Sequence, residues 1–252
     1  MVSPKKRLGQ HFLKDQNIAR KIINSIENKK LPVIEVGPGT GVLTYYMMQA
    51  NQNFFALDVD NESIDYLKEN YPDFSDKFIL ADFLKINLRD YFQNELLVLG
   101  NFPYNISSQL FFRILENREQ VSEVVCMIQK EVAERICATP GSKVYGILSV
   151  LLQAFYVPKY LFTVSEKVFL PPPKVKSAVI RLIRNNNRSL ECDEQLFFLV
   201  VKKAFNQRRK MLSNSLKEFN ISEIEESYLK NRPEQLCVQD FINITKKIKL
   251  NL

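Results

Sequence analysis

The sequence contains one histidine, His11, among 252 residues, so the chain cannot build a catalytic pair of histidines. Its four cysteines are scattered and form no CxxC pair; they are Cys126, Cys137, Cys192 and Cys237. This spacing argues against a disulfide framework and against a cysteine zinc site. We therefore expect reduced thiols in a cytosolic protein.

The sequence also has no leader pattern and no long apolar run. The basic segment Met1 to Arg7 is not followed by an apolar stretch, so we expect no signal peptide. The longest apolar stretch, around Ile147 to Val157, is too short and too polar to span a bilayer, and it predicts a core helix. We expect a cytoplasmic protein without a membrane partner.

The charge balance is basic, with 35 Lys and Arg against 28 Asp and Glu and a net charge of +7. Such a balance favours a polyanionic partner, which can be RNA, DNA or an anionic membrane; the alternative is a merely basic housekeeping protein. Residues 1–30 are especially basic and contain Phe12. They can contact phosphates and cover a pocket, or they can form a solvated, frayed terminus.

A hydrophobic content of 46% is ample for a core, and short apolar segments alternate with helical ones. This alternation predicts a mainly parallel α/β sheet. The expected strands cover residues 33–36, 54–57, 78–81, 96–99, 124–128, 156–164 and 178–183. Four of the first strands end in a polar or glycine-rich cluster, and the carboxyl edge of such a sheet is where ligands bind.

The first strand runs into a glycine-rich turn, Gly37 to Gly41, and a helix follows from about Val42. Asp58 ends the second strand, 21 residues after Gly37, where an acid can bind ribose hydroxyls. Turn and acid together indicate an adenosyl ligand, although Asp58 can instead cap the next helix. Asp82 follows the third strand and can accept from an adenine amino group, or it can be an ordinary loop acid.

Asn101 to Tyr104, the sequence Asn-Phe-Pro-Tyr, follows the fourth strand. We expect Gly100 and Pro103 to let the chain turn sharply there. The Asn101 carbonyl and a backbone carbonyl can accept both N–H hydrogens of an exocyclic amine, and Tyr104 can stack on the base. The alternative is an ordinary turn in which Asn101 is a cap and Tyr104 fills space.

Three prolines, Pro171 to Pro173, hold an extended loop after Phe169, which can be a second stacking wall or a core residue. The polar run at residues 185–189 is the candidate domain boundary and predicts domains 1–184 and 185–252. Helices are expected over 193–205, 210–218, 221–230 and 238–249, with the basic run Gln207 to Lys210 between the first two.

Five motifs occur in the same order as in one family. They are Gly9 to Leu13, Glu35 to Gly41, Asn101 to Ser108, Phe169 to Val179, and Ala204 to Leu212. Over nearly its whole length the chain resembles the ribosomal RNA adenine N6,N6-dimethyltransferases, and among them the small-subunit branch linked to kasugamycin sensitivity. The first and third motifs, together with the Gln-Arg-Arg-Lys run, are specific when they occur together.

This resemblance implies a Rossmann-like class I methyltransferase domain, a small all-helical C-terminal domain and S-adenosyl-L-methionine as methyl donor, without a metal. It implies a monomer that dimethylates two adjacent adenosines in the 3′-terminal hairpin loop of 16S rRNA, late in biogenesis of the 30S ribosomal subunit. Implied cofactor contacts are His11, Leu13, Gly37, Asp58, Asp82 and Asn101. Implied adenine-site residues are Asn101, Pro103, Tyr104 and Phe169. RNA contacts are expected at Arg208, Arg209 and Lys210.

Three positions depart from the commonest family pattern: His11 stands where Asn is frequent, Asp58 replaces a longer Glu, and Phe102 replaces Leu. Rival functions are a large-subunit adenine methyltransferase, a non-enzymatic assembly factor of the same fold, and a DNA N6-adenine methyltransferase. The C-terminal basic segment argues against the first and third. The retained glycine turn, Asp58 and Asn101 argue against the second.

Overall fold

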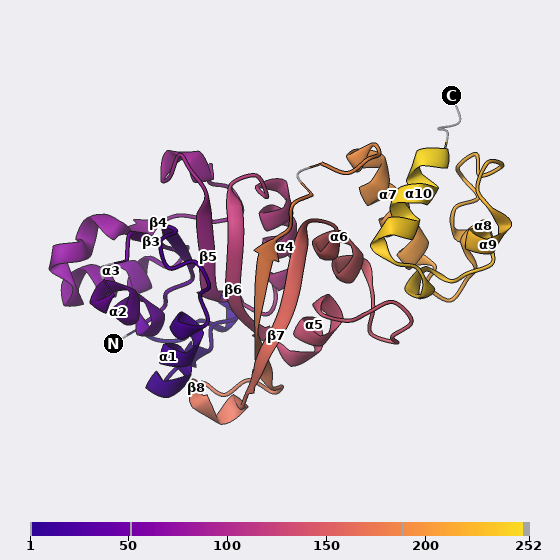
Figure 1. The fold of residues 1–252 in the computed structure, drawn as a ribbon. Helices are drawn as coiled ribbons and strands as arrows, with labels where there is room; N and C mark the ends of the chain where they lie inside the picture. Colours follow the sequence, from indigo (N-terminus) through magenta and orange to yellow (C-terminus); the bar gives the residue numbers. More distant parts are fainter. Residues whose placement is uncertain (1, 51, 188, 249–252) are drawn as a thin grey trace. The chain divides into compact units, whose positions relative to one another are not determined.

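A seven-stranded sheet, in the order β4-β3-β2-β5-β6-β9-β7, is the centre of the computed structural model, which describes residues 2–50, 52–187 and 189–248 (Figure 1). Its strands are β2 (Val33–Val36), β3 (Phe54–Asp58), β4 (Phe78–Leu80), β5 (Leu96–Asn101), β6 (Val121–Gln129), β7 (Tyr156–Val164) and β9 (Ser177–Arg184). The first five pair in parallel, and β9 pairs antiparallel to β6. The predicted α/β sheet is confirmed.

Strand order reverses between β2 and β5, because β3 and β4 follow on one side of β2 while β5 and β6 follow on the other. Every residue of β2 is buried, and β5 is buried as far as Gly100. Open α/β sheets bind ligands where the order reverses, outside the carboxyl ends of the strands. The glycine turn after β2 and Asn101 at the end of β5 therefore meet at the expected ligand edge.

The α-helices are α1 (Gln16–Asn24), α2 (Val42–Gln49), α3 (Asn61–Asn70), α4 (Ser107–Glu116), α5 (Lys130–Ile136), α6 (Ile147–Phe155), α7 (Glu194–Asn206), α8 (Leu212–Ser215), α9 (Glu226–Leu229) and α10 (Val238–Lys247). Asp15 caps α1, since its carboxylate accepts from the N–H groups of Asn17 and Ile18. Capping satisfies amides that have no partner within the helix. Among the described residues, no helix is long and apolar enough to cross a membrane.

A two-stranded ladder forms a second sheet. β1 (Phe12–Leu13) pairs antiparallel with β8 (Phe169–Leu170), so that Phe12 faces Leu170 and Leu13 faces Phe169. Neither strand was expected from the sequence. The ladder brings the N-terminal segment against the start of the proline loop.

The chain divides into two compact units, Met1–Ala133 with Pro158–Arg184, and Glu134–Val157 with Asn185–Leu252. Residues 134–157, expected in the first domain, thus group with the second unit. The reason is α6, whose largely buried, apolar residues pack against α7 and α10. The core helix expected at this stretch is present.

Two helices expected in the second unit are shorter than the sequence suggested. α8 covers only Leu212–Ser215 within the expected 210–218, and α9 covers only Glu226–Leu229 within 221–230. Between them, the Asn220 side chain accepts from the N–H and the hydroxyl of Ser222. Such local side-chain bonds compete with helical hydrogen bonding.

Gly100 was expected to allow a sharp turn, but the structure requires a glycine at this position for a different reason. It lies inside β5, it does not have a positive φ, and a Cβ added to it would lie 2.5 Å from the backbone oxygen of Val36. Because that oxygen belongs to the neighbouring strand, it cannot move aside as a flexible side chain would.

We predict that Gly100→Ala lowers the free energy of unfolding by about 1–3 kcal/mol, because the added methyl group overpacks the β2–β5 contact. Urea unfolding followed by circular dichroism measures this change. Gly146→Ala is the matched control, since its added Cβ would meet nothing closer than 3.6 Å. Equal stability of the two variants would contradict the packing explanation.

Glu35 is a buried acid within β2, 1% exposed, and its Oε2 accepts the Thr44 hydroxyl at 2.6 Å. Burial raises the pKa of Glu35 to about 8; the Thr44 hydrogen bond lowers it in part, and the nearby Asp58 raises it. At neutral pH the carboxyl is therefore mostly protonated. Its bond to Thr44 ties β2 to the first turn of α2 and so braces the glycine turn between them.

A raised folded-state pKa lets Glu35 hold its proton in the native state where the unfolded chain, with an ordinary value of 4.5, has lost it. This group's contribution to stability therefore falls as pH rises from about 4.5 to about 8. We predict that Glu35→Gln, which cannot ionise, is more stable relative to the native protein at pH 8 than at pH 5.

Urea unfolding of both proteins at the two pH values tests this prediction. Glu119→Gln is the control, because Glu119 is exposed and its replacement is expected to shift stability equally at pH 5 and pH 8. A Glu35→Gln effect that did not change with pH would show that the native carboxyl is not protonated.

Candidate active site

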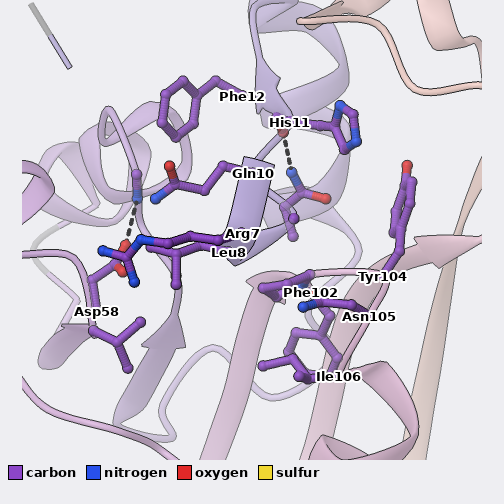
Figure 2. Close-up of a pocket in the computed structure, with 16 residues that line it drawn as sticks. Arg7, Leu8, Gln10, His11, Phe12, Asp58, Phe102, Tyr104, Asn105 and Ile106 are labelled. Atoms are coloured by element: carbon purple, nitrogen blue, oxygen red, sulfur yellow. Dashed lines mark hydrogen bonds between the residues drawn. The ribbon is translucent and has the colours of Figure 1, made fainter. Parts of the chain in front are cut away.

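A cavity of about 270 Å³ lies at the carboxyl edge of the sheet, where Gly37, Asp58 and Asn101 line it from the ends of β2, β3 and β5. The N-terminal segment from Arg7 to Phe12 supplies another wall. Figure 2 shows Asp58 and Arg7 on one side of the cavity and His11 and Tyr104 on the other. Most of the residues expected at the donor and acceptor sites thus line one cavity: His11, Gly37, Asp58, Asn101, Pro103 and Tyr104.

The glycine turn brings the backbone close to this cavity. Gly39 has φ +55°, which strains any residue with a side chain. A Cβ there would lie 2.8 Å from the Phe12 ring, whereas a Cβ on Gly37 would meet nothing within 4 Å. Phe12 therefore packs directly on the turn, while the face of Gly37 stays open to a ligand.

Asp58 is 7% exposed, and its carboxylate accepts from the Asp60 N–H at 2.9 Å and from the Gly39 N–H at 3.4 Å. Burial raises the pKa of Asp58 to about 6, and these backbone bonds oppose the rise. The alternative role of Asp58 as a helix cap is wrong, because Asp60 caps α3 by accepting from Glu62 N–H. Asp58 is thereby left at the cavity wall.

The N-terminal segment is held in place by Asp60. Its carboxylate pairs with the Lys5 ammonium and accepts from Gln10 Nε2 at 2.9 Å. Gln10 Oε1 in turn accepts from the Lys5 N–H at 2.7 Å. The basic segment therefore covers the cavity, one of the two expected arrangements, and is not a frayed terminus. Nothing in the sequence singled out Asp60 as its anchor.

The Asn101 side chain spans from the sheet to this segment. Its Nδ2 donates to the His11 backbone oxygen at 2.8 Å, which fixes the orientation of the amide and so the position of Oδ1. In the described part of the chain Oδ1 has no hydrogen-bond partner. Phe102 is fully buried, and its N–H donates to the Met127 oxygen, which anchors the turn to β6.

Tyr104 and Pro103 both line the cavity. The Tyr104 hydroxyl lies 2.5 Å from Ser177 Oγ of β9. Burial raises the pKa of Tyr104, with the Ser177 bond acting in the opposite direction, so the ring stays neutral at physiological pH. The His11 ring stacks against Tyr104, with ring centroids 5.5 Å apart and an interplanar angle of 28°.

Three expected site residues do not line this cavity. Leu13 lines a smaller cavity of about 30 Å³ together with Glu35 and Gly37. Phe169 is 1% exposed and belongs to the hydrophobic core. Asp82 accepts from the Leu84 N–H at 3.0 Å and lies 3.5 Å from the Lys85 ammonium, as a loop acid would.

The basic run lies in the loop after α7. Arg208 donates to the Lys143 oxygen and lies 3.9 Å from the Glu234 carboxylate, so it ties together parts of the second unit. Arg209 and Lys210 are exposed. These two side chains are therefore available for an outside partner, whereas Arg208 also has internal contacts.

The solved structures most useful for comparison share this fold. A dimethyladenosine transferase from Plasmodium falciparum superposes with a TM-score of 0.77 and 24% identity over 93% of this chain and 96% of that protein. The 23S rRNA methyltransferase ErmE gives a TM-score of 0.68 and 23% identity over 93% of this chain and 99% of that protein. At these identities the likeness establishes the class I methyltransferase fold.

Relatives found by sequence have a higher identity to this chain than these two structures. A protein from Parabacteroides distasonis is 52% identical over 249 residues, covering 97% of this chain and 94% of the relative. A protein from Flavobacterium johnsoniae is 54% identical over 252 residues, covering 98% of this chain and 97% of the relative. Both are named ribosomal RNA small subunit methyltransferase A. The family model for ribosomal RNA adenine dimethylase matches residues 1–249. The chain is therefore an enzyme of the ribosomal RNA adenine dimethylase family.

Proposed function

We propose that this enzyme uses S-adenosyl-L-methionine to dimethylate N6 of two adjacent adenosines in the 3′-terminal hairpin loop of 16S rRNA, acting as a monomer late in assembly of the 30S subunit. The observation that carries the proposal is the free Oδ1 of Asn101, which shares a cavity with Asp58 and the open face of Gly37. The small-subunit names of relatives above 50% identity support the choice of rRNA.

The residues around the glycine turn fit an adenosyl cofactor. Asp58 presents a buried carboxylate for the ribose hydroxyls, and Gly37 leaves room that a side chain would fill. When bound, S-adenosyl-L-methionine supplies an activated methyl group. We further propose contacts from Leu13 and from the backbone of His11. For Asp82, binding of the adenine amino group stays a prediction, since the carboxylate already has a loop partner.

The acceptor side holds and orients the target base. Asn101 Oδ1 and a backbone carbonyl of the turn accept the two N–H hydrogens of adenine N6, which directs the nitrogen lone pair toward the donor. Tyr104 stacks on the base, and Pro103 keeps the acceptors fixed, so they need no reorganisation during the reaction. A stacking role for Phe169 stays a prediction that requires its ring to leave the core.

The main contribution of the protein to catalysis is then to position the methyl donor and the target base relative to each other. The adenine leaves its loop to enter the cavity, which costs a few kcal/mol and less where the base is unpaired. After transfer, the nitrogen is acidic and loses its proton to solvent or to a carbonyl of the site. No strong base is needed, in agreement with a cavity that has the neutral amide of Asn101 at its acceptor side.

The rival functions make different demands on the same cavity. A non-enzymatic assembly factor has no need of a buried Asp58 or a free amide oxygen at residue 101, so binding of S-adenosyl-L-methionine measured by calorimetry discriminates against it. Methylation assays with 30S subunits, 23S rRNA and DNA as substrates distinguish a small-subunit rRNA methyltransferase from a large-subunit one and from a DNA methyltransferase. Mass spectrometry of rRNA digests identifies the modified adenosines.

We predict that Asn101→Ala lowers kcat on unmethylated 30S subunits by at least about 10²–10³-fold, because an oriented acceptor in the transition state is lost. Affinity for S-adenosyl-L-methionine is expected to stay within about tenfold of the native value. Methyl incorporation and calorimetry measure the two effects. Asn70→Ala, at an exposed position of α3, is the control. Retained turnover by Asn101→Ala would refute the role of the amide.

We also predict that Arg209 and Lys210 contact rRNA phosphates. Arg209→Glu or Lys210→Glu is expected to weaken binding to 30S subunits and to reduce the slope of log K against log salt by about 0.7–0.9 per lost contact. Binding measured across a salt series tests this. Lys68→Glu makes the same charge change at an exposed site of α3. If all three variants had the same slope, the basic run would not be a specific contact.

A further inference from the structure

The N-terminal wall of the cavity is held by an ion pair that lies outside the cavity. Residues 7–12 line the cavity, whereas Lys5 and Asp60 are not part of its lining. The Lys5 ammonium pairs with the Asp60 carboxylate and lies 3.0 Å from Glu62 Oε2. This contact joins residues 55 positions apart in the chain, just before the wall and at the N-cap of α3.

Asp60 uses one buried carboxylate for several donors. Its side chain is 2% exposed; Oδ1 accepts from the Lys5 ammonium and the Glu62 N–H, and Oδ2 accepts from Gln10 Nε2 at 2.9 Å. Burial raises the pKa of Asp60, but the bonds from Lys5 and Gln10 outweigh burial and lower it. The hydrogen bond to Asp60 raises the pKa of Lys5. Both groups are therefore charged at neutral pH, so the contact is a charge-assisted hydrogen bond.

Asp60 also connects two different walls of the cavity. Its N–H donates at 2.9 Å to Asp58 Oδ1, the acid proposed to bind ribose. Its side chain holds Gln10, which lines the cavity from the N-terminal segment, and Gln10 Oε1 accepts from the Lys5 N–H at 2.7 Å. Removal of the Lys5 charge therefore weakens the hold on the N-terminal wall and leaves the backbone bond to Asp58 in place.

The wall formed by residues 7–12 belongs to the proposed donor side of the cavity. Arg7 and Gln10 line the cavity together with Asp58, and Figure 2 shows Arg7 and Asp58 on the same side. A ligand at Asp58 gains contacts with this wall only while the wall is in place. A bond that stabilises this position therefore lowers the apparent dissociation constant of the ligand.

We propose that Lys5 and Asp60 are positioning residues of the donor site, and that their ion pair holds residues 7–12 in the position that binds the methyl donor. The assignment rests on the proposed function and deepens it. Neither side chain contacts the donor, so their effect is on donor affinity and not on methyl transfer. Because the Lys5 side chain is 30% exposed, salt screens the pair and weakens this effect.

The test measures binding of S-adenosyl-L-homocysteine, the demethylated donor without a sulfonium charge, by calorimetry. We expect Lys5→Met to raise Kd by about 3- to 10-fold, as for the loss of a partly exposed charged hydrogen bond. Lys6→Met is the matched control, since Lys6 is exposed and makes none of the described ion pairs, and its Kd is expected to stay within about twofold of the native value. High salt is expected to weaken binding more in the native protein than in Lys5→Met.

Three further measurements separate positioning from a general loss of structure. In methylation of 30S subunits at saturating S-adenosyl-L-methionine, kcat of Lys5→Met is expected to stay within about twofold of the native value. Amide hydrogen exchange of residues 8–13 in the ligand-free protein is expected to be faster in Lys5→Met than in Lys6→Met. Asp60→Asn keeps a capping side chain without the charge, and Lys5→Met is expected to cost less affinity in that background than in the native protein.

Several outcomes would overturn the assignment. Equal Kd values for Lys5→Met and Lys6→Met would show that the ion pair does not contribute to donor binding. Additive losses in the double variant of Lys5 and Asp60 would show that Lys5 acts through a different partner. Loss of kcat without loss of donor affinity in Lys5→Met would place its effect outside the donor site. Urea unfolding checks that each variant is folded under the assay conditions.

Failure of this assignment is distinguishable from failure of the proposed function. If the native enzyme does not methylate 30S subunits, the proposed function fails. If it does, and Lys5→Met binds S-adenosyl-L-homocysteine as the native enzyme does, only the role of the ion pair is wrong.

Discussion

The hydrogen bond from Asn101 Nδ2 to the His11 backbone oxygen is the constraint on which the site depends. The amide has an NH2 group with two N–H donors and a carbonyl acceptor, and the bond from Nδ2 to the His11 oxygen fixes which end of the amide is Oδ1, the atom without a partner in the described residues. The same bond holds the N-terminal segment over the cavity from the side of β5, while Asp60 holds it from the side of β3. One interaction thus orients the proposed acceptor atom and closes the space around it.

Sheet topology makes this bond possible. Because strand order reverses between β2 and β5, the glycine turn and Asn101 emerge next to each other without a helix between them. Gly100 lets β5 approach the Val36 oxygen closely. The Glu35–Thr44 hydrogen bond joins β2 to α2 on either side of the glycine turn. The glycine turn and Asn101 are therefore attached to two buried strands of the sheet, β2 and β5.

The positions of the strands and of the residues at their ends were largely predictable from the local sequence pattern. The strand at 156–164 has the bounds expected for it, and Asp58 ends its strand where a ribose-binding acid is placed. Long-range pairing was not predictable: the β1–β8 ladder joins Leu13 to Phe169, and neither two-residue strand has a periodic signal. The same gap explains why Phe169, next to three prolines, was expected at the base and lies in the core. Sequence spacing locates a strand end well, but it does not say which way a side chain turns once a distant segment packs against it.

The proposed stack of the base on Tyr104 suits a reaction that occurs twice on the same nitrogen. In the proposed site, adenine N6 offers two N–H hydrogens to Asn101 Oδ1 and the turn carbonyl before the first transfer. After it, one of them has been replaced by a methyl group, so one acceptor loses its partner at the second transfer. The proposed stacking on Tyr104 does not depend on the number of N–H groups, because it uses a face of the base. A site that held its substrate through the amine alone would bind the monomethyl product more weakly than the substrate, whereas the proposed ring contact is the same for both forms of the base.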